Sequence, residues 1–292
     1  MNNSVPLVSV IIPCYNEEDY ILGSINSILS QDYKSIEIVV IDDNSTDATV
    51  EKINSLNNNK INLIKKACNN GVVDSLNLGI NQAKGEYIAR MDADDISLPS
   101  RISKQVKLME LNKQMVVCGT GHYFMNYRDD DYREVIPLAD DNDIKKQMSM
   151  YSPINAGTAM YRAEVIRSVG CFSIEDTKAE GFSMLTKLKN TGVFGNVCEP
   201  LYVYYLRGSE NNRSASDGFV GRNKAMVDMV SRSSDKYKLK SWLFAHVWSV
   251  YRYVPKPIIS FIRPFVSKKK HRNLSIKEID DLSKLSKSLS QN

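Results

Sequence analysis

Asp92, Asp94 and Asp95 are the residues with the clearest potential for chemistry, because they directly follow a short apolar run. Residues 85–91 have the composition of a buried strand that begins after a glycine turn. Unpaired charge inside a packed strand is very costly, so the acids must lie beyond its carboxyl end, facing solvent or a ligand. Asp92 and Asp94 are two residues apart and point the same way in extended backbone. Such a pair suits Mg²⁺ or Mn²⁺, and the alternative is a solvated acidic turn.

The elements that must position these acids form a repeating strand–helix pattern. Segments with apolar residues at helical spacing alternate with the strand-like runs. This alternation predicts an α/β fold with a Rossmann-like, mostly parallel sheet and helices on both faces. Residues 8–13 are an apolar run ended by proline, as expected of a buried parallel strand, and the other predicted strands of this pattern are residues 36–41, 61–64 and 85–91.

Polar residues also follow two other predicted strands. Tyr15 and Glu17 come after the first strand, and Asp43 comes after the second. Ligands bind beyond the carboxyl ends of the strands in open sheets, so these residues and the acids after the fourth strand form one predicted site. The sequence has no Gly-x-Gly-x-x-Gly after the first strand and no Walker loop, which disfavours a dinucleotide-binding or P-loop fold.

The remaining sequence predicts more elements around the same sheet, followed by an extension. We expect a catalytic unit over residues 1–215, with a donor half at about 1–120 and an acceptor half at about 121–215. A helical extension is expected over residues 216–273, and a polar tail, a frayed helix at most, over 274–292. Strands are predicted at residues 115–119, 154–161, 193–198 and 201–206, a hairpin at 122–136, and helices at 99–111, 140–150, 164–169, 180–189, 218–232 and 236–252.

Composition excludes several classes of protein. The five cysteines are scattered without a Cys-x-x-Cys pair, which predicts reduced thiols in the cytoplasm and argues against a zinc site or a disulfide framework. We expect neither a secretory signal nor a membrane-spanning helix, since no apolar run reaches about 18 residues. The net charge of +4 is uneven, because residues 232–272 hold eleven Lys or Arg and one acid, a net charge of +10.

This basic segment is also rich in aromatic residues. Residues 240–272 interleave Trp242, Trp248 and Phe261 with Lys and Arg, and prolines divide the segment into two short helices. Such a composition suits a helix pair in an anionic membrane interface, so we expect peripheral association with the cytoplasmic face of the inner membrane. The alternative is packing on the catalytic domain. No recognised motif supports binding to nucleic acid.

Three motifs, in order and spacing, closely resemble glycosyltransferase family 2. They are VSVIIPCYNE at residues 8–17, IDDNSTD at 41–47 and GEYIARMDADD at 85–95, and the resemblance covers about residues 5–210. Pro99 and Arg101 also resemble the family pattern. The resemblance implies an inverting enzyme with the type-A glycosyltransferase fold and a nucleotide-sugar donor, most often a UDP-sugar.

The resemblance also implies roles for residues of the predicted site. Tyr15 matches a position that stacks on the nucleobase, and Asp43 matches one that accepts a hydrogen bond from it, chemistry that suits both side chains. Their alternative roles are a half-buried core aromatic and a turn-capping acid. Pro13 and Glu17 are further donor-binding candidates from the first motif.

The metal and the donor diphosphate have their own candidates. Asp94 matches the metal ligand that holds the diphosphate, and Asp92 matches a ribose or metal-side position, so both are candidate ligands of Mn²⁺ or Mg²⁺. Asp95 either orients the other two acids or caps a helix. Arg207 resembles an element that could clasp the diphosphate.

The sequence departs from the family where the resemblance places the catalytic base. The family has a Glu-Asp pair that opens a helix, the second acid usually being the base, whereas this chain has Glu180 followed by Gly181. Glycine cannot accept a proton and supports a helix start less well than aspartate. Glu180 is the favoured base, and Asp176 or its neighbour Glu175 is the alternative. A related subgroup has a His-Pro pair where this chain has Ala156-Gly157.

The sequence therefore predicts a metal-dependent, inverting glycosyltransferase that transfers a hexosyl or N-acetylhexosaminyl group. Its donor would be a UDP-sugar, and its acceptor a glycan or a lipid-linked sugar in the synthesis of a surface polysaccharide such as capsule or lipopolysaccharide. The alternative, suggested by Gly181, is a catalytically weak or inactive nucleotide-sugar-binding protein of the same fold.

Overall fold

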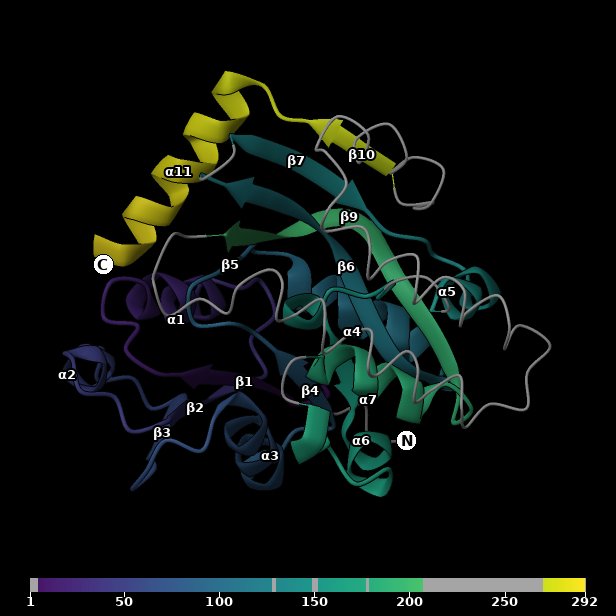
Figure 1. The fold of residues 1–292 in the computed structure, drawn as a ribbon, viewed down its shortest axis with the longest axis horizontal. Helices are drawn as coiled ribbons and strands as arrows, with labels where there is room; N and C mark the ends of the chain where they lie inside the picture. Colours follow the sequence, from purple (N-terminus) through teal and green to yellow (C-terminus); the bar gives the residue numbers. More distant parts are fainter. Residues whose placement is uncertain (1–4, 128–129, 149–151, 177–178, 207–269, 292) are drawn as a thin grey trace.

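A single mixed sheet of ten strands, flanked by helices, organises the chain (Figure 1). The computed structural model describes residues 5–127, 130–148, 152–176, 179–206 and 270–291. The main path of the sheet runs β10-β7-β6-β8-β4-β1-β2-β3, and β5 and β9 pair beside it. The fold class predicted from the sequence, an α/β sheet between helices, is therefore confirmed.

The first half of the chain forms four parallel strands in the order β4-β1-β2-β3. Three helices connect these strands as crossovers, as the strand–helix alternation predicted. The strands are β1 (Val8–Cys14), β2 (Ile36–Asp42), β3 (Ile61–Lys65) and β4 (Tyr87–Arg90), and the helices are α1 (Ile21–Leu29), α2 (Thr49–Ser55) and α3 (Val72–Gln82).

Alternate residues of β1 show why this central strand is almost entirely apolar. Ile11 packs in a cluster with Leu76 and Ile80 of α3, whereas Val10 and Ile12 belong to a second cluster that includes the buried face of α1. Successive strand residues point to opposite faces, so a strand covered on both faces needs apolar residues at every position. The core therefore lies in two layers, one on each side of the sheet.

The second half of the chain extends the sheet with mostly antiparallel strands. The new strands are β5 (Ile96–Ser97), β6 (Met115–Asn126), β7 (Asp131–Ile136), β8 (Met160–Arg162) and β9 (Val193–Leu206). The helical elements are α4 (Arg101–Leu111), α5 (Asp141–Gln147), η1 (Ala156–Thr158), α6 (Ala163–Ser168), η2 (Ile174–Asp176) and α7 (Glu180–Leu188). β6 and β7 form the predicted hairpin, and β9 runs parallel to β6.

Two strand predictions in this half were wrong in detail. Residues 193–206 form one strand, because a bulge that leaves Cys198 and Glu199 out of register carries the chain past Pro200. Residues 154–161 begin with the 3₁₀ turn η1, and only β8 joins the sheet. Asn155 caps that turn by accepting a hydrogen bond from the Gly157 amide at 2.9 Å.

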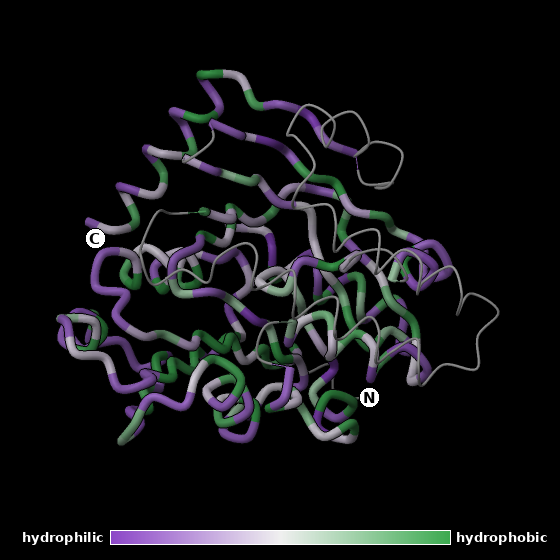
Figure 2. Tube along the Cα trace, viewed as in Figure 1, coloured by the Kyte–Doolittle hydropathy of each residue, from purple (hydrophilic) through white to green (hydrophobic). Residues whose placement is uncertain are grey.

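The C-terminal segment is a docked helix, whereas the sequence predicted a frayed one at most. β10 (Lys270–Asn273) pairs with β7 at the sheet edge, and α11 (Ile276–Gln291) packs against α1. Apolar residues recur among polar ones along α11 (Figure 2). Leu282 joins a cluster with Met125 and Tyr205, and Asn26 donates a hydrogen bond to the Leu289 carbonyl at 2.8 Å. The helix is therefore amphipathic and closes over a third apolar cluster.

Several predicted features lie outside the described residues. They are Arg207, the helices at residues 218–232 and 236–252, and the basic–aromatic segment up to residue 269. At the end of that segment, Arg272 lies on β10 and forms ion pairs with Glu134 at 2.6 Å and Glu278 at 2.7 Å. Within the described ranges, no helix has the length and hydropathy needed to cross a membrane.

Candidate active site at the carboxyl edge of the sheet

A pocket of about 450 Å³ lies where β1, β2 and β4 end. The polar residues predicted to meet at this edge do line one cavity, together with the first residue of α7 and the end of β9. The lining residues are Pro13, Cys14, Tyr15, Glu17, Asp43, Asn69, Gly71, Val72, Ser75, Arg90, Asp92, Ala93, Asp94, Glu180, Tyr204, Tyr205 and Leu206.

Tyr15 is presented to this pocket by a loop that is fastened to the loop after β2. The Asn16 amide donates to Ser45 Oγ at 2.9 Å, and the Glu17 amide donates to Thr49 Oγ1 at 2.8 Å. Asn16 has a φ of 54°, a left-handed conformation that asparagine tolerates better than most residues. Tyr15 is 41% exposed and lines the pocket, so its ring is available to a ligand.

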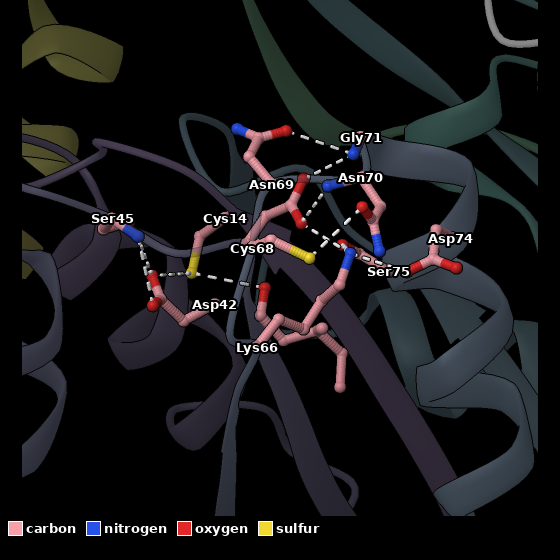
Figure 3. Close-up of polar contacts among 12 residues, drawn as sticks. Cys14, Asp42, Ser45, Lys66, Cys68, Asn69, Asn70, Gly71, Asp74 and Ser75 are labelled. Atoms are coloured by element: carbon pink, nitrogen blue, oxygen red, sulfur yellow. Dashed lines mark hydrogen bonds and ion pairs between the residues drawn. The ribbon is translucent and has the colours of Figure 1, made fainter.

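Asp43 is buried in a network that the sequence did not reveal. Lys66 Nζ lies 2.5 Å from Asp43 Oδ1 and 2.6 Å from Asp74 Oδ2, and the amides of Asn70 and Gly71 donate to Asp43 at 3.1 and 2.7 Å. Figure 3 shows Lys66 beside the turn that carries these amides. A carboxylate has about four acceptor positions, and these bonds occupy three of them. One position is left for a hydrogen-bond donor on a ligand.

The charge of Lys66 is fixed by this network. Burial lowers its pKa, but the hydrogen bonds that Lys66 donates to Asp43 and Asp74 outweigh that effect and raise the pKa above its ordinary value. Lys66 follows β3 directly, so the rule that placed polar residues at the carboxyl edge could also have identified it. Gly71 has a φ of 87° in the adjoining turn, which explains glycine there.

Asp42 and Cys14 have structural surroundings. Asp42 is 2% exposed, and its carboxylate accepts the Ser45 amide at 3.2 Å, so it shapes the turn after β2. Burial, followed by the charge of Asp42, raises the pKa of the Cys14 thiol far above its ordinary value, so this thiol is protonated. Neither residue therefore offers a reactive group to the pocket.

Asp92 and Asp94 line the pocket as the sequence predicted, whereas Asp95 points into the protein. Asp95 is 1% exposed and accepts hydrogen bonds from the Tyr202 hydroxyl at 2.8 Å and the Tyr205 amide at 2.9 Å. Burial, followed by the charges of Asp94 and Asp92, raises the pKa of Asp95. Of its two predicted roles, the geometry favours orientation of the acidic loop, which Asp95 ties to β9.

Arg101, two residues after Pro99, contacts the residues on either side of the same loop. It is fully buried, donates to the Arg90 carbonyl at 2.7 Å, and its guanidinium carbon lies 5.1 Å from the centre of the Tyr202 ring. Burial lowers the pKa of Arg101 to about 10. Arg101 therefore holds the end of β4 against β9, at the point where the acidic loop begins.

Glu180 opens α7 and points into the pocket, where Arg90 meets it. Arg90 Nη2 lies 3.1 Å from Glu180 Oε1 and 2.9 Å from Asp92 Oδ1. Burial alone would lower the pKa of Arg90, but Asp92 and Glu180 raise it, so the guanidinium is charged. The sequence analysis assigned Arg90 to the strand and missed it as a site residue. The alternative base Asp176 accepts a hydrogen bond from Ser183 and is not among the lining residues.

Comparisons with known proteins establish the family of the chain. The family model described as Glycosyl transferase family 2 matches residues 9–170, which is more than half of the chain. The chain belongs to glycosyltransferase family 2. The putative glycosyltransferase EpsE of Bacillus subtilis is 33% identical over 272 residues, covering 90% of this chain and 91% of EpsE.

One further relative of this family 2 glycosyltransferase and one solved structure of similar fold are informative. The Escherichia coli protein WfaP, named as a UDP-Glc:α-D-GlcNAc-diphosphoundecaprenol β-1,3-glucosyltransferase, is 43% identical over 107 residues, which are 37% of this chain and 43% of WfaP. The crystal structure of S. aureus TarS 1–349 in complex with UDP-GlcNAc has a TM-score of 0.65 at 20% identity, covering 85% of this chain and 72% of that chain. This likeness confirms the predicted type-A glycosyltransferase fold.

Gly181 and Ala156, the two positions that the sequence analysis singled out in the acceptor half, lie next to each other in this family 2 glycosyltransferase. A Cβ atom added at Gly181 would lie 2.6 Å from the Cβ of Ala156, far inside van der Waals contact, and 3.8 Å from Arg90 Nη1. Ala156 belongs to η1, whose turn is fixed by its Asn155 cap. The chain therefore has no room for a side chain at residue 181 while alanine occupies residue 156.

Proposed function

We propose that this protein is a metal-dependent, inverting glycosyltransferase that uses a UDP-sugar donor. The observation that carries the proposal is the composition of its pocket. An exposed aromatic ring, Tyr15, and a nearly saturated carboxylate, Asp43, line the same cavity as Asp92, Asp94 and Glu180. This is the set of groups needed to bind a nucleobase, a diphosphate and a reacting hydroxyl.

The donor half of the proposal rests on Tyr15 and Asp43. An exposed aromatic face stacks on a base without requiring a particular sequence of hydrogen bonds. The remaining acceptor position of Asp43 suits the imide N–H of uracil. The TarS complex with UDP-GlcNAc, a protein of the same fold, supports a uridine nucleotide.

Asp92 and Asp94 fit a divalent cation that is shared with the diphosphate. Both hydrogen bonds from Arg90 use Asp92 Oδ1, so Oδ2 remains available, and a Cβ at Gly157 would lie only 3.0 Å from it. Among the described residues, no group of three or more His, Cys, Asp or Glu could hold a metal ion by itself. Asp92 and Asp94 would hold Mg²⁺ or Mn²⁺ together with substrate phosphates, since such ions are commonly bound by one or two carboxylates and phosphate oxygens. When bound, such a cation neutralises charge on the departing diphosphate.

Glu180 is the proposed general base. The acceptor hydroxyl attacks the anomeric carbon from the side opposite the diphosphate, its proton passes to the Glu180 carboxylate, and the bond from the anomeric carbon to the diphosphate oxygen breaks. One displacement of this kind inverts the anomeric centre. Asp176 is a weaker candidate because it lies outside the pocket lining and already accepts from Ser183.

We further propose a glycan or lipid-linked acceptor in the synthesis of a surface polysaccharide. The name of WfaP, which includes a diphosphoundecaprenol-linked acceptor, supports an acceptor of this class. A peripheral position on the cytoplasmic face of the inner membrane, with contact through residues 240–272, would bring the pocket to such a substrate. The transferred group would be a hexose or an N-acetylhexosamine.

The absence of an acid at Gly181 keeps one other function in view, that of a nucleotide-sugar-binding protein with little or no activity. A transfer assay separates the two. The purified full chain is incubated with UDP-glucose, UDP-galactose or UDP-GlcNAc, Mn²⁺ and lipid-linked monosaccharide diphosphates, and UDP release and product mass are measured. Transfer that is lost in Glu180→Gln is expected. UDP-sugar binding without transfer to any acceptor would favour the non-catalytic function.

A further inference from the structure

Arg90 is a buried cation between the two halves of the pocket. Its side chain is 7% exposed, and it lines the cavity together with both carboxylates that it contacts. Nε and Nη2 donate to Asp92 Oδ1 at 3.2 and 2.9 Å, and Nη2 lies 3.1 Å from Glu180 Oε1. A single guanidinium therefore joins the proposed metal side of the site to the proposed base.

The third nitrogen of Arg90 supports the view that these two acids set the position of the guanidinium. Nη1 is buried, and no described residue accepts a hydrogen bond from it. A buried donor without a partner is costly, and it is retained in native structures mainly where another requirement sets the geometry. Here the requirement is contact with Asp92 and Glu180 at the same time.

The neighbouring glycine makes this arrangement specific to Glu180. A side chain at Gly181 would start 3.8 Å from Arg90 Nη1, but Ala156 occupies the space that it needs. A second acid at the start of α7 therefore cannot compete with Glu180 for the guanidinium. Within the described ranges, Glu180 is the only residue of α7 that lines the pocket.

We propose that Arg90 is a positioning residue that holds Glu180 in the orientation from which it accepts the acceptor's proton, and that ties this orientation to Asp92. The inference rests on the proposed function of Glu180 as base. The fork geometry of arginine is essential to it, because Nε and Nη2, held at fixed angles, contact two carboxylates at once, whereas the single ammonium of lysine cannot reproduce that arrangement.

The test is a kinetic double-mutant cycle between Arg90 and Glu180. UDP release from UDP-glucose and from UDP-GlcNAc is measured with Mn²⁺ and water as the acceptor, for the wild type, Arg90→Lys, Glu180→Gln and the double variant. Arg90→Lys is expected to lower kcat by about 10- to 100-fold, since small misplacements of a catalytic group have effects of this size, with KM within about twofold. The double variant should be no slower than Glu180→Gln alone.

The inference is overturned if the loss of kcat in the double variant equals the product of the two single losses. A residue that acts only through Glu180 has nothing to position once Glu180 is replaced, so its own loss should then disappear. A rise in KM with unchanged kcat would likewise overturn it in favour of a donor-binding role. Arg162→Lys is the matched control, because Arg162 is a partly buried arginine that contacts the Tyr87 hydroxyl and the carbonyls of Met109 and Met115 and does not line the pocket. Its effect on kcat should be the same in the wild-type and Glu180→Gln backgrounds.

A second cycle leaves Arg90 intact, in case Arg90→Lys does not fold or water is not an acceptor. The urea midpoints of Asp92→Asn, Glu180→Gln and their double variant are compared. The urea midpoint of the double variant should decrease by more than the sum of the two single decreases, because only the double variant leaves the buried guanidinium without any carboxylate. Additive shifts would refute the coupling. A wild type that neither binds UDP with Mn²⁺ nor releases it from UDP-sugars would instead refute the proposed function, and the inference with it.

Discussion

Substitution of Gly181 tests whether Ala156 excludes a side chain from the start of α7. The Cβ of Gly181→Ala would lie 2.6 Å from the Cβ of Ala156, about 1 Å closer than carbon atoms normally approach. Overpacking of this kind costs about 1–3 kcal/mol. Replacing glycine by alanine within a helix stabilises it by up to about 1 kcal/mol, so the net effect is a loss of about 1 kcal/mol. The melting temperature of a chain of this size would fall by roughly 2–4 °C.

The assay is thermal unfolding of Gly181→Ala in two backgrounds, the wild type and Ala156→Gly. Removal of the Ala156 side chain removes the clash, so the sign of the effect should reverse and Gly181→Ala should then be neutral or stabilising. Gly181→Asp should follow the same pattern, and any gain in UDP release should require Ala156→Gly. Equal destabilisation in both backgrounds, or stabilisation of the wild type, would refute the steric reasoning.

Three other predictions concern the donor site and the fold. Lys66→Met should weaken UDP binding about tenfold, a loss of about 1.4 kcal/mol, because Asp43 loses its cation. The pKa of Lys66 is raised in the folded state, so its contribution to the free energy of unfolding is complete below the ordinary lysine pKa of about 10.4 and is lost only above it. The stability that Lys66→Met loses, measured by urea unfolding, should therefore be equal at pH 6 and pH 9. Gly157→Ala should weaken Mn²⁺-dependent UDP binding in calorimetry, because its Cβ would lie 3.0 Å from Asp92 Oδ2 and 2.6 Å from the Tyr202 hydroxyl. Unchanged affinity would contradict the proposed role of Asp92 in metal binding. Leu282→Ala should cost about 2–4 kcal/mol in urea unfolding, whereas Lys284→Ala on the exposed face of α11 should cost less than about 1 kcal/mol, and equal losses would mean that α11 is not docked.

The first half of the fold was predictable because its signals are local. The central parallel strands β1 and β2 are mostly apolar, and each is followed by polar residues at the same sheet edge. That rule alone brought Tyr15, Asp43 and Asp92 to one pocket. It could also have selected Lys66, which was overlooked because an isolated lysine after a strand looks like an ordinary surface residue.

Other features depend on contacts between distant parts of the chain. Arg90 occupies the last position of β4, and only the arrival of α7, ninety residues later, makes it part of the site. The clash between Gly181 and Ala156 is equally invisible before the two segments meet. The polar composition of α11 concealed an apolar stripe whose partners lie on β6 and β9. In each case the sequence shows the residue but not the surface that it meets.

Isothermal titration calorimetry with UDP, in the presence and absence of Mn²⁺, tests the central claim most directly. The account predicts that UDP binds the wild type, that Mn²⁺ tightens binding by about tenfold or more, equivalent to at least about 1.4 kcal/mol, and that this gain disappears in Asp94→Asn while weak metal-free binding through Tyr15 and Asp43 persists. Binding that is insensitive to Mn²⁺ or to Asp94→Asn would contradict the metal-dependent donor site. No binding of UDP under any condition would contradict the account of the pocket as a whole.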